Sequence, residues 1–290
     1  MFMFNFYVYL LDKIINMKST FIKTILLVPI LLLTLHTNSQ GFQGKATYMS
    51  KSKMELGRWG AKMSVEQKKA VAARLKNRLE KTYTLTFNKQ ESMFLEEEKI
   101  DAISGATDSW GGYFSRGNQY KNVKENELTQ SQEFYGKRFL IKDYLYKIDW
   151  KMGTETKKIG NYTCYKAKAF VPYKELNWYN FSWGDLRKPE PKEGEDKPAE
   201  KLTIVEAWYT LQIPVAQGPA EFWGLPGLIL EVSADNTTLL CTEVVLNTKN
   251  KIKIVAPEKG TKTTKDNYVT IVQTKMLEMR NNRMGRRRGR

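Results

Sequence analysis

Histidine is nearly absent from this sequence of 290 residues: the only one, His36, lies in an apolar run near the N-terminus. If that run is removed during export, the remaining chain has no imidazole. This excludes Ser-His-Asp and Cys-His catalytic sites, histidine-ligated metal sites and a histidine pH switch. The two cysteines, Cys164 and Cys241, are too few for a zinc site of four thiolates. We therefore expect no cofactor and no metal site.

The sequence also lacks the short motifs of several enzyme classes. It contains no phosphate-binding loop of the Gly-x4-Gly-Lys type and no dinucleotide-binding fingerprint. We accordingly predict no catalytic residues. Two carboxylates that act on a glycosidic bond are recognised by their separation in space, so a carboxylate-dependent, glycan-acting enzyme stays open as an alternative.

Residues 1–39 have the composition of a secretory signal peptide, in which 1–16 is an upstream extension. Lys18 and Lys23 supply positive charge, the stretch 25–33 is apolar, and a small polar end at 37–39 would leave Gln40 first after cleavage. The apolar stretch is too short for a spanning helix, which disfavours the alternative of a retained membrane anchor. We expect an exported protein of the periplasm or of the outer-membrane or cell surface.

The net charge of +16 is concentrated partly at the C-terminus, since residues 276–290 hold six arginines and one glutamate. This basic segment is too polar to build a core, so we predict that it is a disordered tail. Export argues against nucleic acid as its partner. Anionic lipid or polysaccharide is the expected partner, and a merely solubilising role is the alternative.

Alternating apolar and polar residues predict an α+β fold that is mainly β: a curved antiparallel sheet or an unclosed barrel packed with one or two helices. A Ser-x-x-Gln capping box at Ser64 and Gln67 predicts a helix over 65–81, and Asp266 is placed to cap a final helix. One domain is expected over 40–275. The predicted strands are 44–50, 82–87, 92–95, 119–123, 132–135, 137–142, 144–150, 162–171, 202–211, 227–232 and 238–246.

A loop rich in proline and charge at 172–201 interrupts this pattern. It carries four large aromatic residues, which either form a partner-binding tip or fold back over the sheet edge. These residues are Trp178, Tyr179, Phe181 and Trp183. The two cysteines also leave two alternatives open, a disulfide between Cys164 and Cys241 or two separate buried thiols.

The most distinctive segment, Gly218–Glu231, contains a Leu-Pro-Gly-Leu turn that leads into an apolar strand. Proline fixes φ and glycine permits unusual backbone geometry, so the segment is predicted to be a rigid structural motif with no chemistry of its own. The residues of this motif are Gly224, Leu225, Pro226, Gly227, Leu228 and Ile229.

The spelling Gly-Leu-Pro-Gly-Leu-Ile resembles the GLPGLI family of exported proteins from Bacteroidetes-type bacteria. The segment from Thr156 to Ala167 and the segments Ala207–Thr210 and Ile213–Val215 are also similar to that family. The resemblance covers about residues 44–247, and the stretch 175–201 looks like an insertion. It implies an exported, mostly β protein linked to outer-membrane biology, and it carries no established activity.

Together these features predict an exported, non-catalytic binding protein for a hydrophobic or lipid-like ligand or an outer-membrane protein. One alternative is an accessory factor of outer-membrane receptors or secretion machinery that docks through the aromatic loop. A curved sheet can enclose an apolar pocket, for which several aromatic residues are candidate lining, with ordinary core packing as their alternative. The candidates are Trp150, Tyr162, Trp208, Tyr209, Phe222 and Trp223.

Overall fold

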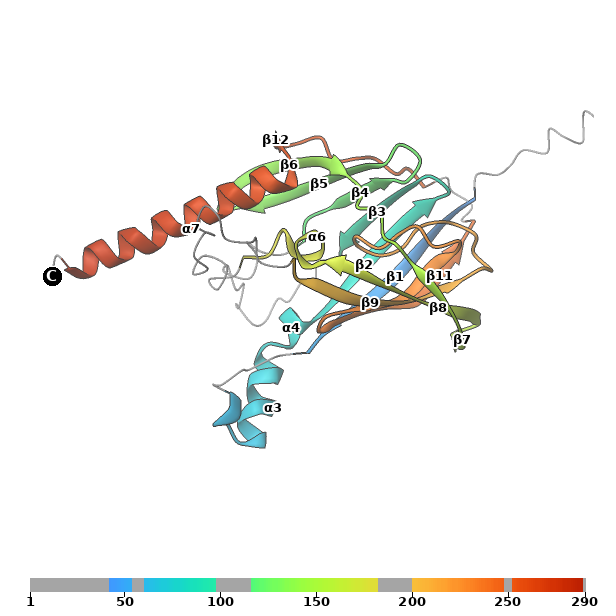
Figure 1. The fold of residues 1–290 in the computed structure, drawn as a ribbon, viewed down its shortest axis with the longest axis horizontal. Coiled ribbons are helices and arrows are strands. Elements are labelled where there is room, and N and C mark those ends of the chain that lie inside the picture. Colours follow the sequence, from blue (N-terminus) through green and yellow to red (C-terminus); the bar gives the residue numbers. More distant parts are fainter. Residues whose placement is uncertain (1–41, 54–59, 98–115, 182–199, 248–251, 289–290) are drawn as a thin grey trace, which may run out of the picture. The chain divides into compact units, whose positions relative to one another are not determined.

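The chain forms one large curved sheet with helices at its margins (Figure 1). The computed structural model describes residues 42–53, 60–97, 116–181, 200–247 and 252–288. The predicted signal segment 1–39 lies outside these residues, and residues 43–290 form one compact unit. None of the helices in the described ranges has the length and apolarity needed to span a membrane.

Twelve strands make up the sheet within the described ranges. The helices there are α3 (Val65–Arg74), α4 (Lys76–Leu79), α6 (Tyr173–Asn177) and α7 (Lys265–Arg288). The strands are β1 (Gln43–Ser52), β2 (Glu80–Asn88), β3 (Glu91–Glu96), β4 (Gln119–Asn122), β5 (Glu127–Phe134), β6 (Lys137–Tyr144), β7 (Lys151–Ile159), β8 (Tyr162–Pro172), β9 (Leu202–Thr210), β10 (Leu228–Ala234), β11 (Thr237–Leu246) and β12 (Thr261–Thr263).

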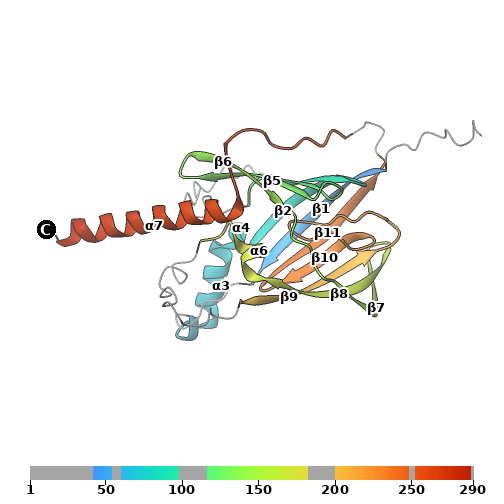
Figure 2. The same ribbon diagram turned by 45° about the horizontal axis from the view of Figure 1, so that its top comes forward.

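The strand order is β12-β6-β5-β4-β3-β2-β1-β11-β10-β9-β8-β7. All neighbours are antiparallel except β12, which runs parallel to β6. The meander β1–β6 and the meander β7–β11 are joined through the long pairing of β1 with β11. Figure 2 shows how strongly the sheet curves without closing. The predicted mainly β, α+β fold with an unclosed sheet is therefore confirmed.

The predicted capping box is present. The Ser64 side chain accepts a hydrogen bond from the Gln67 backbone N–H (3.2 Å), and the Ser64 N–H donates to Gln67 Oε1 (2.9 Å). The helix is shorter than the predicted 65–81, because it breaks at Leu75 and Glu80 already begins β2. Pairing of the Thr- and Tyr-rich stretch that follows with β1 outweighs continued helix formation.

The predicted strand 144–150 is wrong, and the strand that follows it, β7, was not predicted. Residues 145–150 form no strand, and β7 begins at Lys151. The backbone of this connection is held by side chains: the Trp223 indole N–H donates to the Tyr146 carbonyl (2.9 Å) and the Trp150 indole N–H donates to the Trp223 carbonyl (2.8 Å). Apolar residues in this segment therefore face the core without belonging to a ladder.

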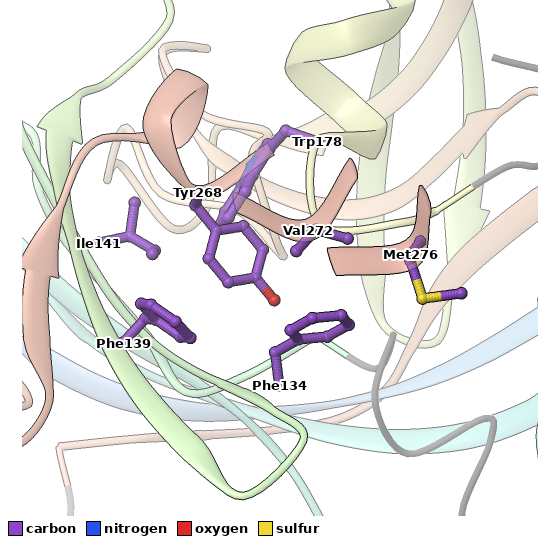
Figure 3. Packing of buried hydrophobic residues seen from close by; sticks show 7 residues of the cluster. All are labelled: Phe134, Phe139, Ile141, Trp178, Tyr268, Val272 and Met276. Atoms are coloured by element: carbon purple, nitrogen blue, oxygen red, sulfur yellow. The ribbon is translucent and has the colours of Figure 1, made fainter. Parts of the chain in front are cut away.

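Helix α7 is anchored to the sheet by a cluster of buried apolar residues (Figure 3). Tyr268, Val272 and Met276 recur every four residues, so they lie on one side of the helix. The ring of Tyr268 meets those of Phe139 and Trp178 with centroid distances of 5.4 and 5.9 Å. The cluster consists of Phe134, Phe139, Ile141, Trp178, Tyr268, Val272 and Met276.

This cluster changes two of the sequence-based expectations. The segment predicted as a disordered tail from 276 continues α7 to Arg288, because Met276 extends the buried stripe and a helix nucleated by packing elongates readily. In the aromatic loop, Trp178 is buried in the cluster, and Tyr179 and Phe181 pack against it. These three residues fold back onto the sheet, whereas Trp183 lies outside the described residues.

We predict that Tyr268→Ala lowers the free energy of unfolding by about 3–5 kcal/mol, the usual cost of deleting a large buried aromatic side chain. Ile271→Ala on the same helix is the control, since Ile271 is 41% exposed and its truncation should change stability by less than about 0.5 kcal/mol. Urea denaturation measures both. Equal losses in the two variants would contradict the anchoring of α7 by Tyr268.

Candidate functional site

The segment between β9 and β10 is fixed by a lysine from a distant strand. Lys121 on β4 is fully buried, and its ammonium group donates to the carbonyl oxygens of Gly218 (2.7 Å), Ala220 (2.7 Å) and Phe222 (3.3 Å). An ammonium group has three N–H donors, so all of them are used. The segment preceding the Gly-Leu-Pro-Gly turn thus wraps around a single buried cation.

The surroundings of Lys121 act on its pKa in opposite directions. Burial lowers the pKa of Lys121 to about 7; the nearby carboxylate of Glu221 opposes this shift and the guanidinium of Arg116 adds to it. The three carbonyl acceptors also favour the charged ammonium form. Lys121 is therefore a buried cation whose protonation is coupled to the backbone that it holds.

Backbone geometry explains why the Gly-Leu-Pro-Gly turn contains two glycines. A Cβ atom at Gly227 would lie 2.0 Å from the Thr210 carbonyl oxygen, and Gly224 has a φ of 91° that other residues rarely adopt. Ala220 also has a positive φ, 53°, which is strained for a residue with a side chain. This conformation is kept because the Ala220 carbonyl is directed at Lys121.

An ion pair lies beside this buried lysine. Arg116 binds Glu221 through its guanidinium, and both side chains are nearly inaccessible to solvent. Arg116 also donates to the Tyr179 hydroxyl (2.9 Å) and lies over the Tyr179 ring at 4.6 Å from its centroid. Burial raises the pKa of Tyr179, which keeps its hydroxyl protonated. Gln119 adds a further hydrogen bond to Glu221 (3.2 Å).

A chain of amide side chains continues the polar cluster along the inner face of β4 and β5. Gln119 donates to Gln130 (3.1 Å), and Gln130 donates to Gln132 (3.1 Å). On β3, the buried hydroxyl of Ser92 donates to Gln217 (2.8 Å), next to the Lys121-bound carbonyls. This part of the inner face is therefore filled with mutually bonded polar groups, and it is not an apolar pocket.

The aromatic residues predicted to line one pocket do not gather at one place. Trp208 and Tyr209 are neighbours on β9 and therefore face opposite sides of the sheet. Tyr209 and Phe222 are core residues, and Tyr162 is half-buried at the start of β8. Trp150 and Trp223 hold two connections through their indole N–H groups.

Trp208 belongs to a charged platform on the outer face of the sheet. Lys157 lies 4.3 Å and Lys166 5.5 Å from the centroid of a Trp208 ring, the geometry of cation–π contacts. Lys157 is also paired with Glu231 (2.7 Å), and Lys166 with Glu155 (3.1 Å). Strands β7 to β10 are thereby cross-linked on their outer side by ion pairs around one indole ring.

The same outer face carries exposed apolar side chains, which we call the outer apolar patch: Phe170, Leu202 and Ile204. They are 54%, 53% and 59% exposed. Phe170 lies directly opposite Ile204 in the pairing of β8 with β9, and Leu202 lies two residues before Ile204 on β9. Since residues at spacing two share a face, the three side chains are adjacent on the surface.

Cys164 and Cys241 are two free, buried thiols in the structure. Burial raises the pKa of Cys164 to about 11 and that of Cys241 to about 12. Both thiols therefore stay protonated at neutral pH, the form that reacts poorly with electrophiles and metals.

Comparison with known proteins identifies one similar family. Residues 150–231, from Trp150 to Glu231 within β10, match the family described as "Protein of unknown function (Porph_ging)". This segment contains the stretches on which the resemblance to the GLPGLI family rests, and the two observations are compatible. None of the curated proteins compared matches the chain.

Among solved structures, two crystal forms of one protein are similar to this chain: "Structure of PNGF-II in C2 space group" and "Structure of PNGF-II in P21 space group". In each, the TM-score is 0.44 and the sequence identity 16%, over 78% of this chain. The similar region is 32% of the PNGF-II chain, so this chain spans about a third of that protein's length.

The sequence did not reveal the residues of the buried cluster. A lysine in a strand is normally exposed, so residue 121 gives no local sign that it is buried. The available signal was the recurrence of glutamine at alternate positions, as in Gln130 and Gln132, because those positions face inward on a strand. The partners of Lys121 are backbone carbonyls about a hundred residues away, which no residue pattern identifies.

We predict that Lys121→Met lowers the free energy of unfolding by more than about 3 kcal/mol, because three buried carbonyl groups lose their donor. The difference from wild type should also depend on pH. Lys121 has a folded pKa of about 7 and an unfolded pKa near 10.4, so the unfolded state binds more protons between these values. Wild-type stability relative to the variant should therefore rise from about pH 7 to pH 10.

Lys142→Met is the matched control, because Lys142 lies on the neighbouring sheet region with its side chain about half exposed. Its stability should stay within about 0.5 kcal/mol of wild type, with no comparable pH dependence. Denaturant titrations across this pH range measure both variants. A wild-type difference that is small, or that falls with rising pH, would contradict the role of Lys121.

Proposed function

We propose that the protein is an exported, non-catalytic binding protein of the bacterial cell envelope that binds a protein partner on the outer face of β8 and β9. The observation that carries this proposal is the outer apolar patch of Phe170, Leu202 and Ile204. Single exposed apolar residues are normal on a protein surface, but adjacent ones favour an interaction site. Here three large side chains, each more than half exposed, occupy neighbouring positions on two paired strands.

The inner face of the sheet gives less support to a lipid-like ligand. The residues around Lys121 bond to one another, and the segment 213–227 packs against this region. The candidate pocket aromatics are divided between the core, the outer face and two connections. A ligand on the inner face would have to displace the polar contacts around Lys121, so the outer face of the sheet is the better place for binding.

The carboxylates near the site support binding over catalysis. Glu155 and Glu231 are each paired with a lysine on the outer face, and Glu206 is paired with Lys168 (2.9 Å). Glu221 is buried against Arg116. Carboxylates held by cations in this way stabilise the surface and the core, whereas a general acid or base needs access to a substrate.

The surroundings of the outer apolar patch resemble the anatomy of a protein–protein interface, in which an apolar centre is surrounded by polar groups. The Lys168–Glu206 pair lies beside the patch on β8 and β9. On its other side Lys201 lies over the Tyr173 ring, 4.1 Å from the centroid. The cation–π contacts of Trp208 with Lys157 and Lys166 link β7, β8 and β9 on the same face. A partner would therefore meet a preorganised surface.

The proposal is tested with the photo-crosslinking residue p-benzoylphenylalanine placed at position 170 or 204 in the native bacterium. We expect a discrete product with one envelope protein from both positions. Ile204→Glu, combined with the crosslinker at 170, should reduce that product at least tenfold, because a charge would be buried at the apolar centre.

The matched control places the crosslinker at Val65 on α3, which is 62% exposed but lies outside the patch. Because all three positions are exposed, each variant should retain wild-type stability in denaturation. The proposal fails if positions 170 and 204 give no product, or only the products that position 65 also gives.

A further inference from the structure

We propose that the partner of the outer apolar patch is bound through its extended C-terminal segment, which adds a short strand beside residues 169–172 of β8. This inference rests on the proposed function and names the part of the partner that is recognised. It is carried by a ladder position that no described strand fills, by the direction of the Phe170 backbone groups, and by two lysines at the end of that position.

The last residues of β8 have a neighbouring strand on one side only. Strand β9 pairs with β8 over 165–172, whereas β7 pairs with it only over 162–168. Residues 145–150, which precede β7, leave the sheet where the indole of Trp150 binds another segment. Within the described ranges, residues 169–172 therefore lie beside an unfilled ladder position. An open strand side of this kind is a template on which an extended peptide can add a further strand.

The hairpin between β7 and β8 shows which backbone groups face this position. Its two-residue turn begins with Gly160 at a φ of 56°, so the two residues that flank the turn form a hydrogen-bonded pair of the ladder. Every second residue of β8 from Tyr162 on then directs its N–H and C=O toward the β7 side. The Thr163 N–H, which donates to Gln212 after β9 (2.8 Å), agrees with this alternation. Phe170 therefore presents its N–H and C=O to the unfilled position.

An added strand would also place side chains on the outer apolar patch. Phe170 is more than half exposed and lies opposite Ile204, so a residue opposite Phe170 on the added strand shares their face of the sheet. Ala169 and Val171 point to the other face and are buried. The backbone of Phe170 thus fixes the register of the added segment, and the patch selects an apolar side chain at one of its positions.

Two lysines meet at the end of the unfilled position. Lys151, the first residue of β7, lies directly opposite Lys168. Like charges at opposite positions of a sheet are unfavourable. Lys168 is paired with Glu206 (2.9 Å), whereas the exposed Lys151 has no acidic partner among the residues that the structure describes. A negative group at this point would therefore relieve the repulsion between the two lysines.

The direction of the added strand identifies this negative group. A strand antiparallel to β8 runs in the same direction as β7, so its C-terminal end would approach Lys151. Because β7 fills the ladder from Lys151 onward, the added segment ends or turns away there. A C-terminal carboxylate would lie beside Lys151 and Lys168, whereas a parallel strand would bring a positively charged N-terminus to the same place. The charges therefore favour a free C-terminus that follows shortly after an apolar residue.

The test maps the crosslink that p-benzoylphenylalanine at position 170 forms in the native bacterium. Mass spectrometry of the digested product identifies the partner residue that is joined. We expect it among about the last five residues of the partner, because residues 169–172 leave room for one short strand. A crosslink to an internal segment would overturn the C-terminal mode while the proposed function stands. The absence of product from positions 170 and 204 would overturn both.

A charge reversal tests the carboxylate separately. With the crosslinker at position 170, Lys151→Glu should reduce the product at least about fivefold, because the new charge repels the C-terminus. Lys158→Glu is the matched control: it makes the same charge change at an exposed position near the other end of β7, and its product should stay within about twofold of wild type. Equal reductions in the two variants, or no reduction in Lys151→Glu, would overturn the proposal.

Discussion

The ammonium group of Lys121 is the contact on which the distinctive part of this structure depends. Three carbonyl oxygens converge on it, and they belong to residues 218, 220 and 222, directly before the Gly-Leu-Pro-Gly turn. Unbonded carbonyls at this depth would each cost about 1–3 kcal/mol. The side chain of Lys121 therefore supplies these three carbonyl groups with the hydrogen bonds that a neighbouring strand would otherwise give. Because Lys121 lies on β4 and the carbonyls lie between β9 and β10, this contact also links the two meanders of the sheet.

The sequence predicted those features that depend on local pattern. The capping box at Ser64 and the strand after Gly227 were found in this way, as was the mainly β fold. Trp208 and Tyr209 are successive residues of a predicted strand, so the sequence already implies that they face opposite sides of the sheet. The prediction of one shared pocket considered only that both are aromatic. Lys121 and the pair of Arg116 with Glu221 depend on contacts between distant segments, which a single sequence does not contain.

The two faces of the sheet differ in chemistry. The inner face of β3 to β5 is closed by polar bonds that include Ser92 and Gln217, which makes this region a support for the segment 213–227. The outer face of β8 and β9 combines ion pairs, one indole platform and the outer apolar patch. An outer surface whose strands are cross-linked by ion pairs suits the proposed binding of a partner, since little conformational entropy is lost on association.

Hydrogen exchange of the segment 213–229 tests the central role of Lys121 most directly. Its backbone amides at Gly224, Leu228 and Ile229 donate to carbonyls of the same segment, so they are protected only while the segment keeps its shape. In Lys121→Met we predict exchange at least tenfold faster for this segment than in wild type, with little change in β1 and β11. Unchanged protection of residues 213–229 in that variant would contradict the account.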